Sequence, residues 1–199
     1  KDILESKGKK KLTQVYVHTP LEANACEQSG IDMIVSSENN NFKFLRESAM
    51  NTFFTIGLQF GRYLSEYEII KRSFQLLETG ADAIYCPQSS RFIKAIANEG
   101  IPVVGHAGFI PYKATHYGGF KAYGKNLNEA KKILKQIHTL QEAGAFATEI
   151  EIVPEEIIEI LYKKTDIFLI GMGSGTICDA QYLFSEDILG YNNGHIPRH

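Results

Sequence analysis

The chain has 199 residues, of which 44% are hydrophobic and 22% are charged, and its formal net charge is −2. This size and composition fit one globular domain with a sizeable core, and they exclude a disordered or fibrous chain. The near-neutral charge argues against a nucleic-acid partner, and no apolar stretch approaches the roughly 20 residues of a membrane span.

Eight short apolar runs are the candidate strands, with helical segments between them. They occupy 13–18, 32–36, 52–58, 81–86, 102–108, 146–152, 167–173 and 180–184. Most are almost continuously apolar, which is typical of parallel strands covered on both faces. The clearest helix spans 126–144, where apolar residues recur at helical spacing. The pattern therefore indicates an α/β protein.

Glycines mark the predicted helix ends. These glycines are Gly30, Gly80, Gly100 and Gly144, and a candidate strand follows directly after each. A βα unit repeated eight times without a long linker predicts a (β/α)8 TIM barrel, a single domain over 1–199. Between the second and third strands there is room for one helix and almost no loop. Either that loop is short or residues are absent near 39–41, and the sequence leaves both open.

Glu149 and Glu151 lie two residues apart in the sixth strand, so their side chains share one face. A barrel strand has a lumen face and a helix-covered face. Because a charge against apolar helices carries a heavy desolvation cost, we expect both carboxylates in the lumen. Glu151 would lie near the C-terminal mouth, where such barrels build active sites, with Glu149 one layer deeper. Glu149 is either a structural acid kept neutral, which we favour, or a partner that tunes Glu151.

Other motifs predict less. The run "KGKKK" at 7–11 is interpreted as a solvated N-terminal segment rather than a polyanion site. The three cysteines are far apart in the sequence, which favours neither a disulfide framework nor a zinc site. "GMGSG" at 171–175 could cradle a phosphate, but no basic residue accompanies it, so a tight turn is favoured. No signal segment opens the chain, and we expect a cytoplasmic protein. The missing initiator methionine suggests that residues precede the first.

Several segments together resemble one known family. They are "GIPVVGHAGFIPYKATHYGGFKAYG" at 100–124, "LQEAGAFATEIEIVPEEI" at 140–157, "IGMGSGTICDAQYLFSEDILG" at 170–190 and "GHIPRH" at 194–199. In this order they resemble ketopantoate hydroxymethyltransferase, a pantothenate-biosynthesis family of the phosphoenolpyruvate mutase and isocitrate lyase superfamily. The resemblance implies a (β/α)8 barrel assembled as a homo-oligomer, usually a decamer.

The resemblance also implies a reaction and its site. The family takes a proton from a branched 2-oxo acid, 3-methyl-2-oxobutanoate, and adds a one-carbon unit from methylenetetrahydrofolate to give ketopantoate, with Mg²⁺ holding the oxo acid. By position, Glu151 matches the general base and His106 a substrate-binding histidine. Asn39 stands at a substrate-contacting serine, and Glu38 at an aspartate that ligates the metal. Without the resemblance, His106 would be interpreted as a strand-end histidine satisfied by backbone groups.

Three positions depart from the family pattern. Gly57 replaces another metal-contacting aspartate, Tyr85 a lysine and Pro87 a glutamate. Magnesium prefers several hard oxygen ligands in octahedral geometry, and one carboxylate is a poor anchor. Two functions therefore stay open: hydroxymethyl transfer or a related C–C bond reaction beside a carbonyl, and a non-catalytic barrel with a binding or scaffolding role.

Overall fold

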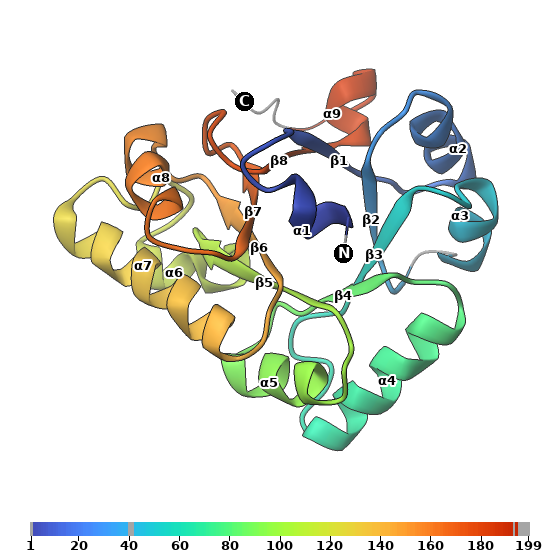
Figure 1. Ribbon diagram of the computed structural model, residues 1–199, viewed down its shortest axis with the longest axis horizontal. Helices are drawn as coiled ribbons and strands as arrows, with labels where there is room; N and C mark the ends of the chain where they lie inside the picture. Colours follow the sequence, from blue (N-terminus) through green and yellow to red (C-terminus); the bar gives the residue numbers. More distant parts are fainter. Residues whose placement is uncertain (1, 40–41, 193, 195–199) are drawn as a thin grey trace.

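A computed structural model describes residues 2–39, 42–192 and 194, and its strands close into a parallel barrel (Figure 1). The strands follow one another in chain order, β1 to β8, and β8 pairs with β1. Their bounds are β1 Leu12–Tyr16, β2 Met33–Ser37, β3 Phe53–Gly57, β4 Ala83–Tyr85, β5 Val103–Gly108, β6 Ala147–Glu151, β7 Phe168–Met172 and β8 Ala180–Phe184. Six lie within predicted runs, whereas β1 begins one residue before its run and β2 ends one residue after its run. The predicted (β/α)8 barrel is confirmed.

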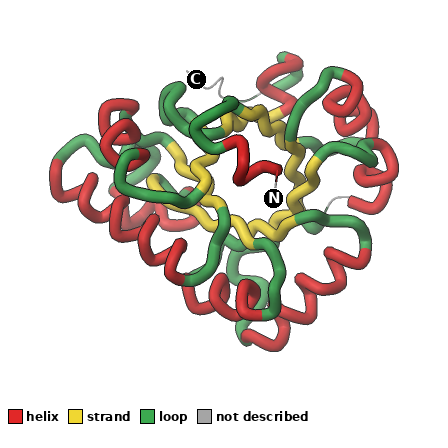
Figure 2. The backbone as a smooth tube through the Cα atoms, in the orientation of Figure 1, coloured by secondary structure: helices red, strands yellow, loops and turns green. Residues whose placement is uncertain are grey.

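Helices surround the barrel, except α1, which lies across its N-terminal end (Figure 2). The helices are α1 Asp2–Ser6, α2 Pro20–Gln28, α3 Phe42–Ser48, α4 Glu66–Glu78, α5 Ser90–Asn98, α6 Ala114–Tyr117 after the 3-10 turn Pro111–Lys113, α7 Leu127–Glu142, α8 Glu155–Tyr162 and α9 Ser185–Leu189. The four predicted helix-ending glycines adopt φ between 74° and 98°, where glycine carries no Cβ penalty. Asn40 and Asn41, where the sequence left a shortened loop open, lie outside the described residues. No described helix is long and apolar enough to cross a bilayer.

The repeat is not uniform, because residues 173–179 form a loop and no helix joins β7 to β8. Ile170 pairs with Ala180, so β8 begins level with the middle of β7 and a short connection suffices. The loop also covers the outer side of β7. A Cβ added to Gly171 would lie 2.8 Å from the Cys178 sulfur, so this close contact requires glycine.

Apolar side chains fill two layers, one between strands and helices and one in the barrel lumen. The lumen layer includes Met33, Val35, Phe168 and Ile170. In Figure 2, α1 lies across the centre of the ring of strands, and Ile3 of α1 packs on the lumen layer. The N-terminal end of the lumen is therefore plugged by apolar packing, and the C-terminal end is where such barrels build active sites.

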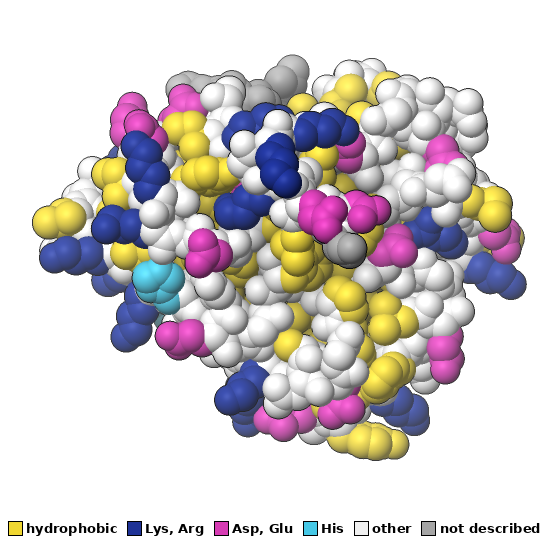
Figure 3. All heavy atoms as spheres, viewed as in Figure 1, with side chains coloured by type: hydrophobic (Ala, Val, Ile, Leu, Met, Phe, Trp, Pro, Cys, Tyr) yellow, Lys and Arg dark blue, Asp and Glu magenta, His cyan; other side chains and the backbone are white. Residues whose placement is uncertain are grey.

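The predicted solvated lysine run is only partly solvated. Lys7 Nζ lies 2.9 Å from Asp179 Oδ2, a carboxylate with no exposed side-chain area, and Lys10 Nζ lies 2.6 Å from Asp32 Oδ1. Lys11 Nζ donates to the carbonyl oxygens of Ile177 and Cys178. These contacts attach the segment to strand ends and to the β7–β8 loop. On the face in Figure 3, basic and acidic side chains are interspersed.

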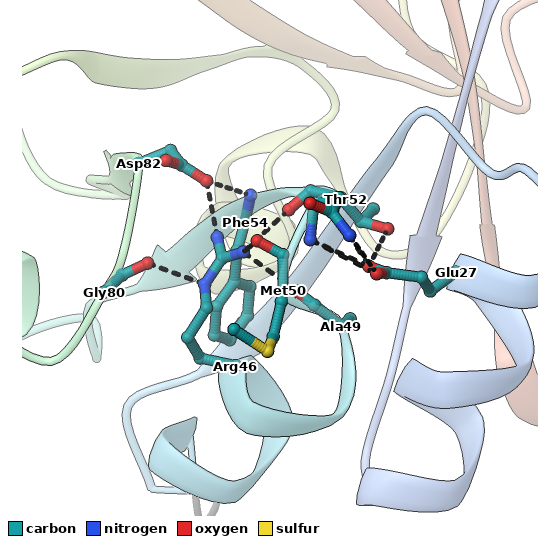
Figure 4. Close-up of polar contacts among 9 residues, drawn as sticks. Glu27, Arg46, Ala49, Met50, Thr52, Phe54, Gly80 and Asp82 are labelled. Atoms are coloured by element: carbon teal, nitrogen blue, oxygen red, sulfur yellow. Dashed lines mark hydrogen bonds and ion pairs between the residues drawn. The ribbon is translucent and has the colours of Figure 1, made fainter.

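Arg46 of α3 joins the loops at the N-terminal end of the barrel (Figure 4). Its guanidinium donates to the backbone oxygens of Gly80, Ala49, Met50 and Thr52 and to the Asp82 carboxylate. Its side chain is 16% exposed, so these carbonyl groups are largely shielded from water. We expect Arg46 to contribute to stability rather than to chemistry, because the active sites of such barrels occupy the opposite face.

Candidate active site

A cavity of about 820 Å³ opens at the C-terminal end of the barrel. Its lining includes the last residue of seven strands, namely Tyr16, Ser37, Gly57, Tyr85, Glu151, Met172 and Phe184. This volume and this position are typical of small-molecule sites in such barrels. The cavity is therefore the candidate active site.

Glu149 and Glu151 both line this cavity, as their shared strand face predicted. They are 5% and 8% exposed. In the β5–β6 register His106 pairs with Glu149 and Gly108 with Glu151, which puts Glu151 one layer nearer the mouth. The predicted lumen placement and order of the two carboxylates are confirmed.

His106 has a defined tautomer. Its Nε2 lies 3.1 Å from the carbonyl oxygen of Phe109, which can only accept, so Nε2 carries the hydrogen. In the neutral ring Nδ1 is then an acceptor, and the Tyr85 hydroxyl donates to it at 2.6 Å. The alternative interpretation, a histidine satisfied by backbone groups, therefore holds for Nε2, whereas the partner of Nδ1 is a side chain. Burial raises the pKa of Tyr85 well above its ordinary value, with Glu149 adding to the effect, so the phenol stays protonated.

Burial also raises the pKa of Glu149 from 4.5 to about 7. His106 opposes this shift, whereas the neighbouring Glu151 adds to it. Gln14 Nε2 donates to Glu149 Oε1 at 3.4 Å, a long contact that stabilises the charge only weakly. The shift supports the interpretation of Glu149 as an acid that stays largely neutral below pH 7.

Glu151 keeps one carboxylate oxygen without a hydrogen bond. Its Oε2 is buried and lies 3.2 Å from His106 Nε2, but the N–H of that nitrogen is directed at Phe109. The next residue, Ile152, has φ 49°, a strained value for a β-branched side chain. Strained residues and unsatisfied polar atoms gather at functional sites, because surrounding structure must hold them there.

Gly108 fixes the turn that brings Phe109 to His106. Its φ is 82°, and an added Cβ would lie 2.7 Å from the Glu151 carbonyl oxygen. No other residue fits there without moving β6. This backbone contact holds the ends of β5 and β6 together, so His106 and Glu151 are set in place by glycine packing.

Gly57 and Tyr85 are also sterically linked. They are partners in the β3–β4 register, and a Cβ added to Gly57 would lie 3.3 Å from Tyr85 Cδ1. The tyrosine ring therefore uses space that a side chain at position 57 would need. The two departures from the family pattern that the sequence showed separately act together in the cavity wall.

The Glu38 carboxylate points away from the cavity. Met33 and Val35 face the lumen, so strand alternation directs Ser37 to the cavity and Glu38 to the helices. Its carboxylate, with no exposed side-chain area, accepts from Arg72 Nε at 2.8 Å, from the Gln59 backbone N–H at 2.8 Å and from the Tyr63 hydroxyl. Both of its oxygens are thus engaged.

The donor set does not fit a magnesium ion. The described residues contain no group of three or more His, Cys, Asp or Glu side chains arranged to hold a metal. In the cavity, Glu149 is largely protonated below pH 7, and the other carboxyl groups of the described lining residues are those of Glu151 and Asp187, of which Asp187 accepts a hydrogen bond from Asn192 Nδ2. These carboxyl groups do not form the near-octahedral oxygen shell that Mg²⁺ requires.

Asn39 and Arg62 lie together at the mouth, where both line the cavity. Arg62 Nη1 lies 3.3 Å from Asn39 Oδ1 and 2.9 Å from Gln59 Oε1. The predicted site residues Glu151, His106 and Asn39 thus share one cavity. Sequence analysis missed Arg62, whose only signal was its position in the loop after a strand, at the end where barrel sites form.

The "GMGSG" segment is a tight turn. Glu155 Oε1 accepts from the backbone N–H and the hydroxyl of Thr176, at 2.7 and 2.8 Å. The Ser174 hydroxyl accepts from the Val153 N–H and donates to the Ile150 carbonyl oxygen. The Glu155 carboxylate lies against the loop and would repel a phosphate, so these contacts agree with a tight turn rather than a phosphate site.

Comparison with known sequences gives one consistent match. The ketopantoate hydroxymethyltransferase family model matches residues 39–199. A 3-methyl-2-oxobutanoate hydroxymethyltransferase of Kosmotoga olearia is 32% identical over 222 aligned residues, covering 100% of this chain and 83% of the relative. The enzyme of the same name from Pyrococcus furiosus is 29% identical over 99% of this chain and 78% of its own length.

Solved structures share the fold. A putative phosphonomutase of Burkholderia cenocepacia has a TM-score of 0.71 at 11% identity, covering 91% of this chain and 89% of its own. A 2,3-dimethylmalate lyase, a member of the PEP mutase/isocitrate lyase superfamily, has a TM-score of 0.68 at 12% identity, covering 96% of this chain and 81% of its own. At such low identity these likenesses establish the barrel alone.

Proposed function

The chain belongs to the ketopantoate hydroxymethyltransferase family, and on that premise we propose that it transfers a hydroxymethyl group to a branched 2-oxo acid. A proton leaves the carbon beside the carbonyl, and that carbon forms a bond to the methylene carbon of methylenetetrahydrofolate. Water supplies the hydroxyl oxygen, and tetrahydrofolate leaves. The acid that fits the relatives' name is 3-methyl-2-oxobutanoate.

The observation that carries this proposal is the free oxygen of Glu151. A general base must present an unoccupied lone pair within reach of the acidic C–H. Glu151 lines a cavity large enough for a branched oxo acid, and its buried Oε2 has no hydrogen-bond partner. The strained backbone at Ile152, directly after Glu151, supports the same assignment, because strained residues cluster at functional sites.

Negative charge develops on the carbonyl oxygen during proton removal, and hydrogen-bond donors must stabilise it. His106 and Tyr85 line the cavity. To stabilise the substrate oxygen, one of them would have to exchange its present acceptor, the Phe109 carbonyl oxygen for His106 or His106 Nδ1 for Tyr85, for that oxygen. Because the pKa of Tyr85 is raised, its phenol keeps its proton at neutral pH. The family reaction uses Mg²⁺ for this task. Since the donor set in this cavity does not fit the ion, the cavity's own side chains must supply the stabilisation.

A non-catalytic barrel that binds a small molecule is the second candidate. It is favoured by one observation, the capture of the Glu38 carboxylate by Arg72 and Tyr63 in the helix layer. For both candidates we propose the homo-oligomeric assembly that family membership implies. A strictly monomeric mass by light scattering over a wide concentration range would contradict this proposal.

Deuterium exchange at the carbon beside the carbonyl of 3-methyl-2-oxobutanoate separates the two candidates. Followed by NMR, it reports proton removal without the folate. We expect exchange in the parent and a rate about 100-fold or more lower in Glu151→Gln, the size of a general-base contribution. Glu159→Gln alters an exposed glutamate of α8, 56% exposed, and should exchange like the parent.

The exchange should be run with Mg²⁺ and with a chelator in its place. Equal rates in the parent and in Glu151→Gln would remove Glu151 from the mechanism. No exchange in either protein under both conditions would favour the binding barrel.

A further inference from the structure

The charges that line the cavity are unbalanced. Glu149, Glu151 and Asp187 contribute carboxyl groups, whereas Arg62 is the one lysine or arginine among the described lining residues. An anion entering a cavity with carboxylates on its walls is repelled unless a positive charge compensates it. Arg62 is the fixed cation available for this purpose.

Arg62 differs from the other arginines that the structure describes. Each of those faces a carboxylate: Arg46 contacts Asp82, Arg72 contacts Glu38, and Arg91 contacts Glu66. Arg62 instead donates from Nη1 to the neutral amide oxygens of Gln59 and Asn39. Arg62 forms no ion pair with any residue that the structure describes, and its side chain is exposed at the cavity mouth.

The neighbours of Arg62 hold it toward the cavity without neutralising it. Gln59, in the β3–α4 loop, and Asn39, in the segment after β2, also line the cavity. Their side-chain oxygens both accept from Nη1 of the guanidinium. The nearby Glu68 carboxylate accepts from the Ser65 hydroxyl and from the backbone N–H groups of Leu64 and Ser65 instead. The guanidinium is thus positioned but keeps its charge for a ligand.

We infer that Arg62 binds the carboxylate of the 2-oxo acid and so takes over the anchoring that the family assigns to a metal ion. This inference rests on the proposed function for the identity of the acid. A guanidinium fork matches a carboxylate with two parallel hydrogen bonds. The stacked rings of Phe60 and Tyr112, whose centroids are 4.7 Å apart, line the same mouth and offer apolar surface to the branched alkyl group.

Direct binding measurements test the inference. Calorimetry would compare 3-methyl-2-oxobutanoate with its neutral carboxamide, in the parent and in Arg62→Gln, without metal. We expect Arg62→Gln to weaken binding of the acid by about 10-fold or more, the usual size of a hydrogen bond to a charged group, and to leave binding of the amide unchanged. Arg62→Lys should recover part of the affinity, because it keeps the charge and loses the fork.

Arg91→Gln is the matched control, since Arg91 is 62% exposed on α5 and does not line the cavity. Equal affinity for the acid in the parent and in Arg62→Gln would overturn the inference and leave the proposed function standing. Absence of acid binding in the parent would overturn both. If the acid binds through Arg62 but no deuterium exchange follows, the inference stands and the proposed function fails.

Discussion

At the scale of single residues, the cavity is defined by which groups carry protons. His106 holds its hydrogen on Nε2 because Phe109 offers only a carbonyl oxygen, and Tyr85 completes the ring by donating to Nδ1. Glu149 lies level with His106 in the β5–β6 register and has a pKa of about 7. Glu151, one layer nearer the mouth, keeps a free oxygen. Two carboxyl groups on one strand therefore have different chemistry, set by depth.

Glu149→Gln should stabilise the protein at alkaline pH. The folded pKa is about 7 against 4.5 for the free side chain, so the native state binds more protons and stability falls as pH rises from about 4.5 to about 7. Above pH 7 the full cost, roughly 3 kcal/mol, is present, and glutamine removes it. At pH 4.5 the same change should alter the free energy of unfolding by less than about 0.5 kcal/mol.

Urea unfolding of the parent and Glu149→Gln at pH 4.5 and pH 8 checks this prediction. Glu159→Gln serves as the surface control. A gain of the same size at both pH values would show that titration of Glu149 is not its cause.

At the scale of secondary-structure elements, the end of β2 is attached to α4 through a buried ion pair. Strand alternation turns Glu38 to the helices, where Arg72 reaches it, and Tyr63 in the β3–α4 loop adds a hydrogen bond. The same alternation turns Ser37 to the cavity. A residue that the sequence offered as a metal ligand is thus engaged in contacts between elements.

Arg72→Met should lower the free energy of unfolding by about 3 kcal/mol, because it leaves the Glu38 carboxylate buried without its cation. Arg72→Met combined with Glu38→Gln should recover part of this loss, since no buried charge remains. Chemical denaturation at pH 7 of the parent, Arg72→Met, Glu38→Gln and the double variant gives the four free energies of unfolding. A double variant whose loss equals the sum of the single losses would mean that the two side chains do not interact.

At the scale of the whole molecule, the two ends of the barrel have separate tasks. The N-terminal end is closed by α1 and tied together by Arg46, whereas the cavity opens at the C-terminal end. Such barrels separate stability from chemistry in this way. Changes at Arg46 should therefore affect folding and leave the cavity unaltered.

Arg46→Met should lower the free energy of unfolding by about 3 kcal/mol, because carbonyl groups at the helix end and in two loops lose their donor. Below the unfolding transition, binding of 3-methyl-2-oxobutanoate should match the parent. Denaturation and calorimetry measure the two quantities, and Arg91→Met, which removes an exposed pair, should cost less than about 1 kcal/mol. Weaker ligand binding in Arg46→Met would contradict the separation of the two ends.

The sequence by itself determined the barrel, the strands and the face on which Glu149 and Glu151 lie. These follow from local rules, because apolar runs, helix-ending glycines and the two-residue period of a strand are all visible along the chain. Only the tertiary structure decided the tautomer of His106, the engagement of Glu38 by Arg72 and the exposure of Arg62 without a carboxylate partner. It also replaced the expected helix between β7 and β8 with a loop. The physical reason is that hydrogen bonds and charge pairing depend on side chains that distant segments bring together, and no local period encodes which of them meet.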